Sequence, residues 1–170
     1  MLSKTITDAL NQQIEKEGYA SFLYLSMATW CDSNGLQGCT RFFRRQSEEE
    51  HVHMTKIIDY ILEMDGRAII PQIKQPPTEY KGVSEVFEST YEHEKKVTSA
   101  INSLVDLALE ENDHSTHNFL QWYVEEQREE ENLIRSILDK IKLIGQGEQA
   151  LYYIDKEVEE INLAIKKSGA

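Results

Sequence analysis

Four long stretches of this chain carry apolar residues at helical spacing, and no other feature limits its possible folds as strongly. Apolar residues that recur every three or four positions form one stripe on a helix, and such stripes cover 6–28, 43–64, 87–108 and 120–144. The 170 residues include only 8 glycines and 3 prolines, a composition that favours long helices over a turn-rich β fold. The sequence therefore predicts an all-α bundle of four helices that bury their stripes against one another.

A long crossover and a fifth helix complete the predicted architecture. Residues 65–81 hold all three prolines and link the second stretch to the third. A helix over 36–64 is about 43 Å long, whereas this loop can extend to roughly 56 Å, so the second and third helices can run parallel. Residues 148–166 carry another apolar stripe, which either folds back on the bundle or contacts another subunit. We expect one domain over 1–170, with the bundle over about 4–144.

Each of the four stripes is interrupted near its middle by polar residues. Burying an unpaired carboxylate costs much free energy, so acids on a core stripe need compensating partners. The alternative is that the stripes are misphased and the acids face water. The interrupting residues are Glu17 in the first stretch, Glu50 and His53 in the second, Glu94 in the third, and Gln127 and Glu130 in the fourth.

The spacing of these residues repeats between the two halves of the chain. Glu17 and Glu50 are 33 residues apart, as are Glu94 and Gln127, and the two pairs are offset by 77 residues. In the second and fourth stretches the polar residues form pairs three positions apart, which lie on one helix face. Because all of them fall near helix midpoints, we expect them to meet at one height. Carboxylates from four helices with one imidazole match a di-metal site and favour iron or manganese over copper or a structural zinc.

Charge and cysteine content exclude several other classes of function. The formal net charge is −12, so nucleic acid is a poor partner, because phosphate binding needs clustered Lys and Arg. Cys31 and Cys39 form no C-x-x-C pair, which excludes a thiolate zinc or rubredoxin-like iron site and indicates reduced thiols. Residues 1–13 show no signal core, and no apolar run approaches the roughly 20 residues that span a bilayer. We expect a cytoplasmic protein without membrane contact.

At these residues the sequence resembles the bacterial non-haem ferritins over essentially its whole length. The resemblance is especially close at 118–124, which read NFLQWYV, and in the acids that follow. It implies a ferritin-like four-helix bundle with one long crossover plus a short C-terminal fifth helix. The implied ligands are Glu17, Glu50 and His53 for a first ferroxidase iron, and Glu50, Glu94 and Glu130, with Gln127 adjacent, for a second.

The resemblance also implies roles for residues beside these two irons. A tyrosine such as Tyr24, two turns after Glu17, would lie beside the first iron, hydrogen-bond the site and lend an electron during oxygen reduction. Simple core packing is the alternative for its ring. A third iron position would use acids that could equally form solvated helix faces, namely Glu49, Glu126, Glu129 and Glu130.

Histidines outside the main group receive different interpretations. His51 stands where haem-binding ferritins carry an iron-ligating methionine, so no haem is expected. It also points about 100° away from Glu50 on the helix, which favours an exposed side chain over a ligand. Asp113, His114 and His117 open the fourth helix in a region that lines threefold pores in ferritins. A polar helix terminus is the alternative for these three residues.

By resemblance, the chain is expected to store iron and to oxidise Fe(II) with O2 or hydrogen peroxide inside a homo-oligomeric shell of 24 subunits. The fifth helix would pack around the fourfold axis of that shell. One competing function is a free-standing di-iron oxidase or peroxidase of the rubrerythrin type. Such an enzyme normally shows rubredoxin cysteines, which are absent here, and a closer Glu-x-x-His symmetry, which Gln127 and Glu130 break. Another is a metal-free helical scaffold, which would not need acids on four core stripes. A miniature DNA-protecting ferritin is disfavoured by the long helices and the absence of a basic tail.

Overall fold

In a computed structural model that describes residues 1–168, the chain forms five α-helices and, within that range, no strand. The helices are α1 (Lys4–Ser33), α2 (Gln37–Glu63), α3 (Val83–Glu110), α4 (His114–Ile144) and α5 (Glu148–Ser168). The prediction of an all-α chain with four long helices and a shorter fifth is therefore confirmed. None of these helices is both long and apolar enough to cross a membrane.

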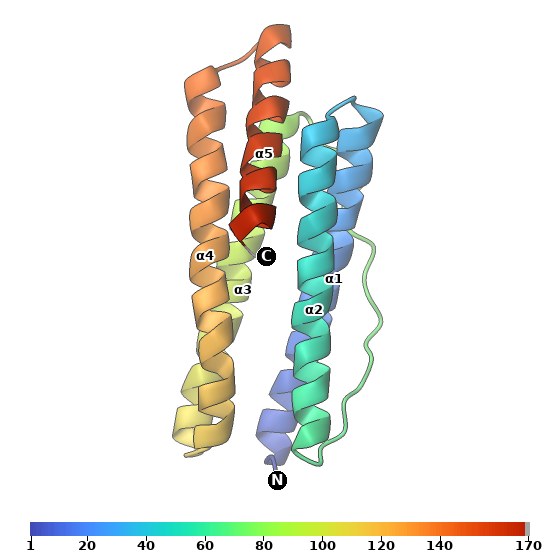
Figure 1. The fold of residues 1–170 in the computed structure, drawn as a ribbon. Coiled ribbons are helices and arrows are strands. Elements are labelled where there is room, and N and C mark those ends of the chain that lie inside the picture. The colour runs from blue at the N-terminus through green and yellow to red at the C-terminus, as the bar shows by residue number, and fades with distance from the viewer. Residues whose placement is uncertain (169–170) are drawn as a thin grey trace.

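The first four helices form a bundle in which α2 and α3 run in the same direction (Figure 1). Residues 64–82 connect them as an extended crossover that returns along the length of the bundle. Side chains of α1 hold this crossover in place. Asn11 accepts a hydrogen bond from the backbone N–H of Ile69 at 2.7 Å, and Ser26 donates one to the carbonyl of Pro77 at 2.7 Å. The predicted crossover between parallel helices is confirmed.

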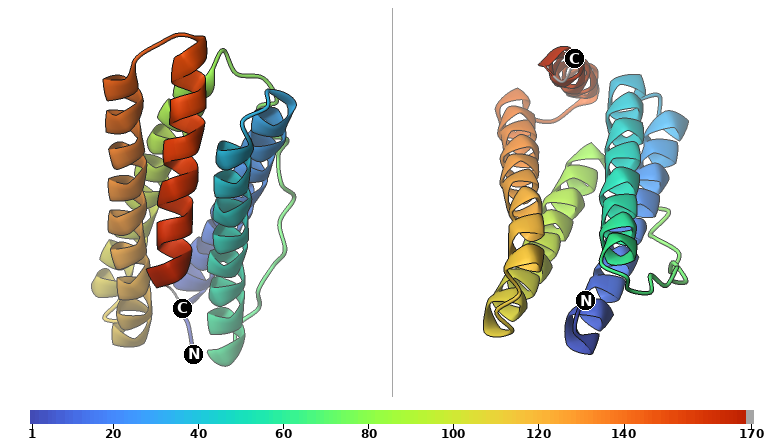
Figure 2. Two further views of the ribbon diagram at one scale, coloured as in Figure 1. Left: turned by 45° about the horizontal axis from the view of Figure 1, so that its top comes forward. Right: turned by 60° about the horizontal axis from the view of Figure 1, so that its bottom comes forward.

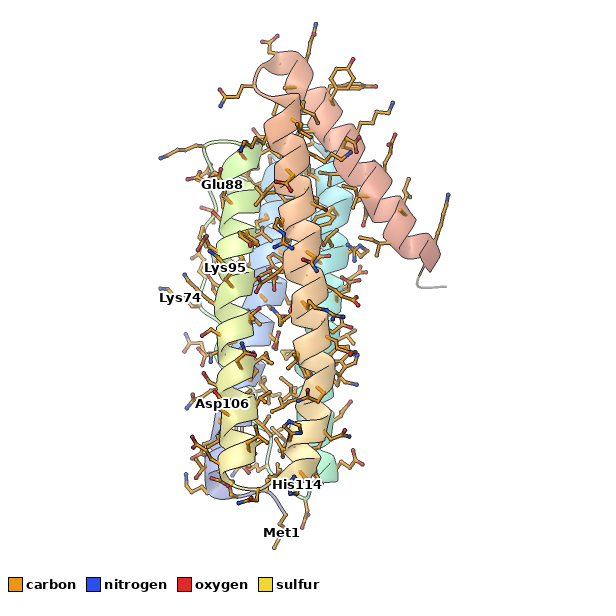
Figure 3. All side chains as sticks on the ribbon, turned by 90° about the vertical axis from the view of Figure 1, so that its left-hand side faces the viewer. Met1, Lys74, Glu88, Lys95, Asp106 and His114 are labelled. Atoms are coloured by element: carbon orange, nitrogen blue, oxygen red, sulfur yellow. The ribbon has the colours of Figure 1, made fainter. Side chains whose placement is uncertain are left out.

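The fifth helix folds back on its own chain and packs against α2 and α4. Figures 2 and 3 show it inclined across the outside of the bundle, beginning at the end where α4 finishes. Its contact with α2 is very close, because a Cβ atom on Gly38 would lie 2.2 Å from the carbonyl oxygen of Asp155. The Asp155 carboxylate accepts hydrogen bonds from the backbone N–H groups of Gly38 at 3.0 Å and Cys39 at 2.8 Å. Asp155 thus caps the start of α2, where the local residue Leu36 makes no capping bond.

The core consists of two apolar clusters separated by a polar layer. In α1, residues 6–14 belong to one cluster and 20–31 to the other, and Glu17 lies between them. The same division recurs in α2, α3 and α4 around the polar residues of their stripes. Those residues are buried, so the alternative in which the stripes are misphased and the acids face water is wrong.

Candidate metal centre

Glu17, Glu50 and His53 form a compact group in the polar layer. Helix α1 supplies Glu17, and one turn of α2 supplies the other two residues. Their potential ligand atoms all lie within 4.8 Å of one another, and none of the three residues is more than 3% exposed. Two carboxylates and one imidazole at this separation can bind a metal ion through oxygen and nitrogen.

Several atoms of this group have no hydrogen-bond partner among the described residues, namely Oε2 of Glu17, Oε1 of Glu50 and Nδ1 of His53. The last of these lies 3.3 Å from Oε2 of Glu50 without hydrogen-bond geometry. Neighbouring residues support the group, since Gln13 donates to Oε1 of Glu17 at 2.7 Å and Tyr123 donates to the carbonyl of His53 at 2.7 Å. Buried polar atoms without partners are rare, because each loses its hydration without compensation. Unpartnered ligand atoms held by a supporting shell fit a bound cation.

Glu94 and Glu130 lie in the same layer, but each accepts hydrogen bonds from neighbouring side chains. Tyr24 donates to Oε1 of Glu94, and Gln127 donates to Oε2 at 2.9 Å. Oε2 of Glu130 accepts a hydrogen bond from Gln46 at 2.8 Å. The structure therefore joins Tyr24, Glu94 and Gln127 in one network. The hydroxyl of Tyr24 meets a residue assigned to the second iron, whereas we expected the tyrosine beside the first.

Burial and mutual repulsion favour the protonated form of the acids in this layer. Burial raises the pKa of Glu17 to about 7, and burial with repulsion from Glu94 raises that of Glu130 to about 8. Burial, followed by repulsion from Glu94 and Glu17, also raises the pKa of Glu50 well above its usual value. Burial lowers the pKa of His53 to about 4, so its ring is neutral and available as a ligand. A cation that binds here must displace protons from the acids.

The acids predicted for a third iron position lie at the edge of this layer. Oε2 of Glu126 is 3.8 Å from Nε2 of His53. Burial, and then repulsion from Glu129 and Glu49, raises the pKa of Glu126. Glu129 is exposed, whereas Glu49 and Glu126 are partly covered and Glu130 is buried. These acids are thus near enough to interact, and they extend from the buried centre toward solvent.

His51, His114 and His117 lie outside the centre. His51 is exposed, as its position on the helix predicted. Asp113 accepts a hydrogen bond from the backbone N–H of Thr116 at 3.0 Å and caps the start of α4. His114 is exposed at that end of the bundle, which is also the end where Met1 lies (Figure 3). The helix-terminal interpretation therefore accounts for Asp113, and a pore lined by these residues stays a prediction.

Two buried glutamines, Gln13 and Gln46, were not predicted to belong to the site. They donate hydrogen bonds to Glu17 and Glu130 respectively. The two glutamines are themselves 33 residues apart, and they precede Glu17 and Glu50 by four positions. Extending the repeat by one helical turn would have identified both of them.

Comparison with known proteins agrees with this arrangement. Residues 7–144 match the ferritin family, described as a ferritin-like domain. The chain is 48% identical over 167 residues to a bacterial non-heme ferritin of Campylobacter jejuni, covering 98% of this chain and 100% of that protein. It is 47% identical over 162 residues to a probable bacterial non-heme ferritin-like protein of Haemophilus influenzae, covering 95% and 98%.

The fold also matches a solved structure. An open pore ferritin from the hyperthermophilic archaeon Archaeoglobus fulgidus superposes with a TM-score of 0.90 at 44% identity, covering 93% of this chain and 96% of that one. The predicted ferritin-like fold is therefore confirmed, and the sequence matches extend over nearly the full length of the chain. The chain belongs to the bacterial non-haem ferritins, which are iron-storage proteins with ferroxidase activity.

Proposed function

We propose that this protein oxidises Fe(II), with O2 or hydrogen peroxide as the oxidant, at a two-iron centre in each subunit and stores the Fe(III) product inside a shell of 24 subunits. The observation that carries the proposal is the buried group of Glu17, Glu50 and His53 with its unpartnered ligand atoms. Membership of the ferritin family supplies the class of reaction. Iron is the substrate and the cargo of this protein.

The proposed reaction uses the acids, His53, Gln127 and Tyr24 of the polar layer. Bound side by side, two Fe(II) ions each supply an electron to the oxidant. Tyr24 hydrogen-bonds Glu94 and holds that carboxylate toward the second ion. The acids release protons as Fe(II) binds, because burial has raised their pKa values. The ligands are Glu17, Glu50 and His53 for the first iron, and Glu50, Glu94 and Glu130, with Gln127 adjacent, for the second.

The two iron positions differ in their ligands. The first offers His53 beside Glu50, whereas the matching pair in the other half of the chain is a neutral amide, Gln127, followed by Glu130. Gln127 donates its amide hydrogens to Glu94 rather than offering a negative charge. The second iron is therefore held less tightly, and oxidised iron leaves from this side of the centre.

Oxidised iron that leaves the second position moves first to a third iron position. Its ligands are Glu49, Glu126, Glu129 and Glu130. Support comes from their mutual electrostatic effects and from the gradient in exposure between buried Glu130 and exposed Glu129. Iron that moves outward along these acids exchanges one set of carboxylate oxygens for another, which suits the hard Fe(III) ion.

Storage requires a closed container, and the fifth helix supplies contacts for one. Although α5 packs on its own bundle, Leu151, Tyr152 and Tyr153 remain 43%, 66% and 56% exposed. Apolar and aromatic side chains on one helix are suited to burial between subunits. Ending the chain at Gly147 should abolish the 24-subunit species in analytical ultracentrifugation. A truncated chain that still forms the complete shell would contradict this assembly role.

We further propose that the shell lies in the cytoplasm and that residues 1–170 form a single domain.

One experiment tests the function as a whole. Fe(II) is added in air to the purified protein, and both the oxidation rate and the iron that elutes with the protein particle are measured. Retention far beyond three irons per chain supports storage. Oxidation without retention would instead support a free-standing di-iron oxidase, and the absence of both activities would support a metal-free scaffold.

A further inference from the structure

Arg45 is a nearly buried cation that lies between α5 and the acids of the centre. Its side chain is only 10% exposed. Nε donates to Oδ1 of Asn162 on α5 at 2.6 Å, and Nη1 donates to Oε1 of Glu49 at 2.5 Å. The guanidinium also lies over the ring of Phe42, with 5.4 Å between its carbon and the ring centroid. These three contacts hold the guanidinium, whose Nη2 has no hydrogen-bond partner among the described residues.

The partner of Arg45 on α5 is a buried polar side chain, Asn162. Asn162 is 1% exposed and is the one buried polar residue among those described in α5. It lies on the helix face that also buries Ile154 and Val158. A polar side chain on an apolar face is costly unless it is hydrogen-bonded. Arg45 supplies the bond to Oδ1 of Asn162, whereas Nδ2 has no partner among the described residues. The hydrogen bond between Asn162 and Arg45 therefore makes the position of the Arg45 side chain depend on how α5 packs against the bundle.

The partner of Arg45 on the other side is a carboxylate with one free oxygen. Oε1 of Glu49 is held by the arginine, whereas Oε2 is covered and has no hydrogen-bond partner among the described residues. Repulsion from Glu49 also raises the pKa of both Glu126 and Glu130. One oxygen is thus anchored while the other is available to a cation shared with those acids.

We propose that Arg45 is a positioning residue that holds Glu49 as a ligand for iron leaving the two-iron centre, and that Asn162 holds Arg45 in turn. Docking of α5 thereby sets how tightly iron binds at the third position and how quickly the centre is cleared for a new pair of ions. This inference rests on the proposed function, because it assigns a role to the exit acids. Supporting residues around metal ligands commonly change metal affinity by about 10- to 100-fold.

The test compares Arg45→Gln with a matched control, Arg41→Gln. Arg41 lies one turn earlier on α2 and also bonds to α5, through Glu159 at 2.9 Å, but the Arg41 side chain is 51% exposed. Fe(II) is titrated under nitrogen into the assembled protein by calorimetry, and oxidation is then followed for a first and a second addition of two irons per chain. For Arg45→Gln we expect the third binding event to weaken about tenfold, and the second oxidation to slow more than the first. Arg41→Gln should change none of these.

Two further variants separate positioning from a general structural effect. Asn162→Ala should weaken the third event in the same direction as Arg45→Gln, and Arg45→Gln should have no added effect in a Glu49→Gln background. If Arg45→Gln does not assemble, Asn162→Ala with and without Glu49→Gln provides the same comparison. A third event that is unchanged or tighter, or effects that add in the double variant, would overturn the inference. Failure of the unaltered protein to bind or oxidise Fe(II) would instead overturn the proposed function.

Discussion

The hydroxyl of Tyr24 on α1 donates a hydrogen bond to the carboxylate of Glu94 on α3, across the middle of the bundle. Both side chains are at most 1% exposed, so the bond is not shared with water. Burial and the repulsion of Glu94 raise the pKa of the tyrosine well above its usual value, which keeps the hydroxyl protonated as a donor. This contact joins one half of the repeated sequence to the other.

Replacing Tyr24 by Phe removes that donor and leaves the ring. We expect the metal-free protein to lose about 1–3 kcal/mol of unfolding free energy, because Glu94 loses a buried partner. Fe(II) oxidation should slow, while the number of Fe(II) ions bound under nitrogen stays the same. Stopped-flow absorbance and anaerobic titration measure the two effects. Loss of Fe(II) binding at the first position would contradict the proposal that Tyr24 acts by holding Glu94.

Replacing Glu130 by Ala tests the inequality of the two iron positions. Glu130 belongs to the second position and to the exit acids, whereas the first position uses other residues. We expect the second binding event to weaken and the first to remain within about twofold, since the first-position ligands stay in place. Glu125→Ala is the matched control, because it removes an exposed carboxylate from the same helix. Equal loss from both positions in an iron titration would contradict the proposed asymmetry.

The docking of α5 can be tested at Asp155 and Gly38. Asp155→Ala removes the cap from the start of α2 and should destabilise the protein by about 1–2 kcal/mol. Gly38→Ala places a methyl group against the Asp155 carbonyl, so α5 must move outward. Chemical denaturation measures the first effect, and limited proteolysis after Ile144 reports the second. Asp59→Ala, which removes an exposed carboxylate from the same helix, should leave both unchanged.

The buried acids predict an unusual dependence of stability on pH. The folded pKa values of Glu17, about 7, and Glu130, about 8, exceed the ordinary 4.5, so the folded state holds protons that the unfolded state releases. Stability from these groups therefore falls as pH rises from 4.5 through 8. His53, with a pKa of about 4 instead of 6.5, acts in the opposite direction, but only between those two values.

Above pH 6.5 only the acids contribute, so the metal-free protein should lose roughly 2 kcal/mol of unfolding free energy between pH 6.5 and 8. Denaturation at a series of pH values measures this loss, and a saturating divalent cation should remove it by replacing the protons. Glu130→Gln should reduce this loss of stability with pH, because it removes the acid whose pKa is about 8 and leaves Glu17, whose pKa is about 7. Metal-free stability that stays flat or rises over this interval would contradict the assigned protonation.

The sequence was sufficient to predict the helices, the parallel crossover and the burial of the central acids. Helical spacing fixes which residues share a face, and the 33-residue repeat brings Glu17 and Glu50 to one height. Contacts that depend on the tilt and rotation of separate helices could not be predicted. Asp155 caps the start of α2 by bonding to Gly38, which lies 117 residues earlier in the chain, and the partner of Tyr24 depends on how far α1 is rotated toward α3.

The most direct test of the account is the position of iron in crystals soaked anaerobically with Fe(II) and measured by anomalous scattering at the iron absorption edge. We predict a strong peak in coordination contact with Glu17, Glu50 and His53, and a weaker neighbouring peak between Glu50, Glu94 and Glu130. Iron found only on exposed acids, with no peak inside the Glu17 group, would contradict the assignment of this site as the centre of Fe(II) oxidation.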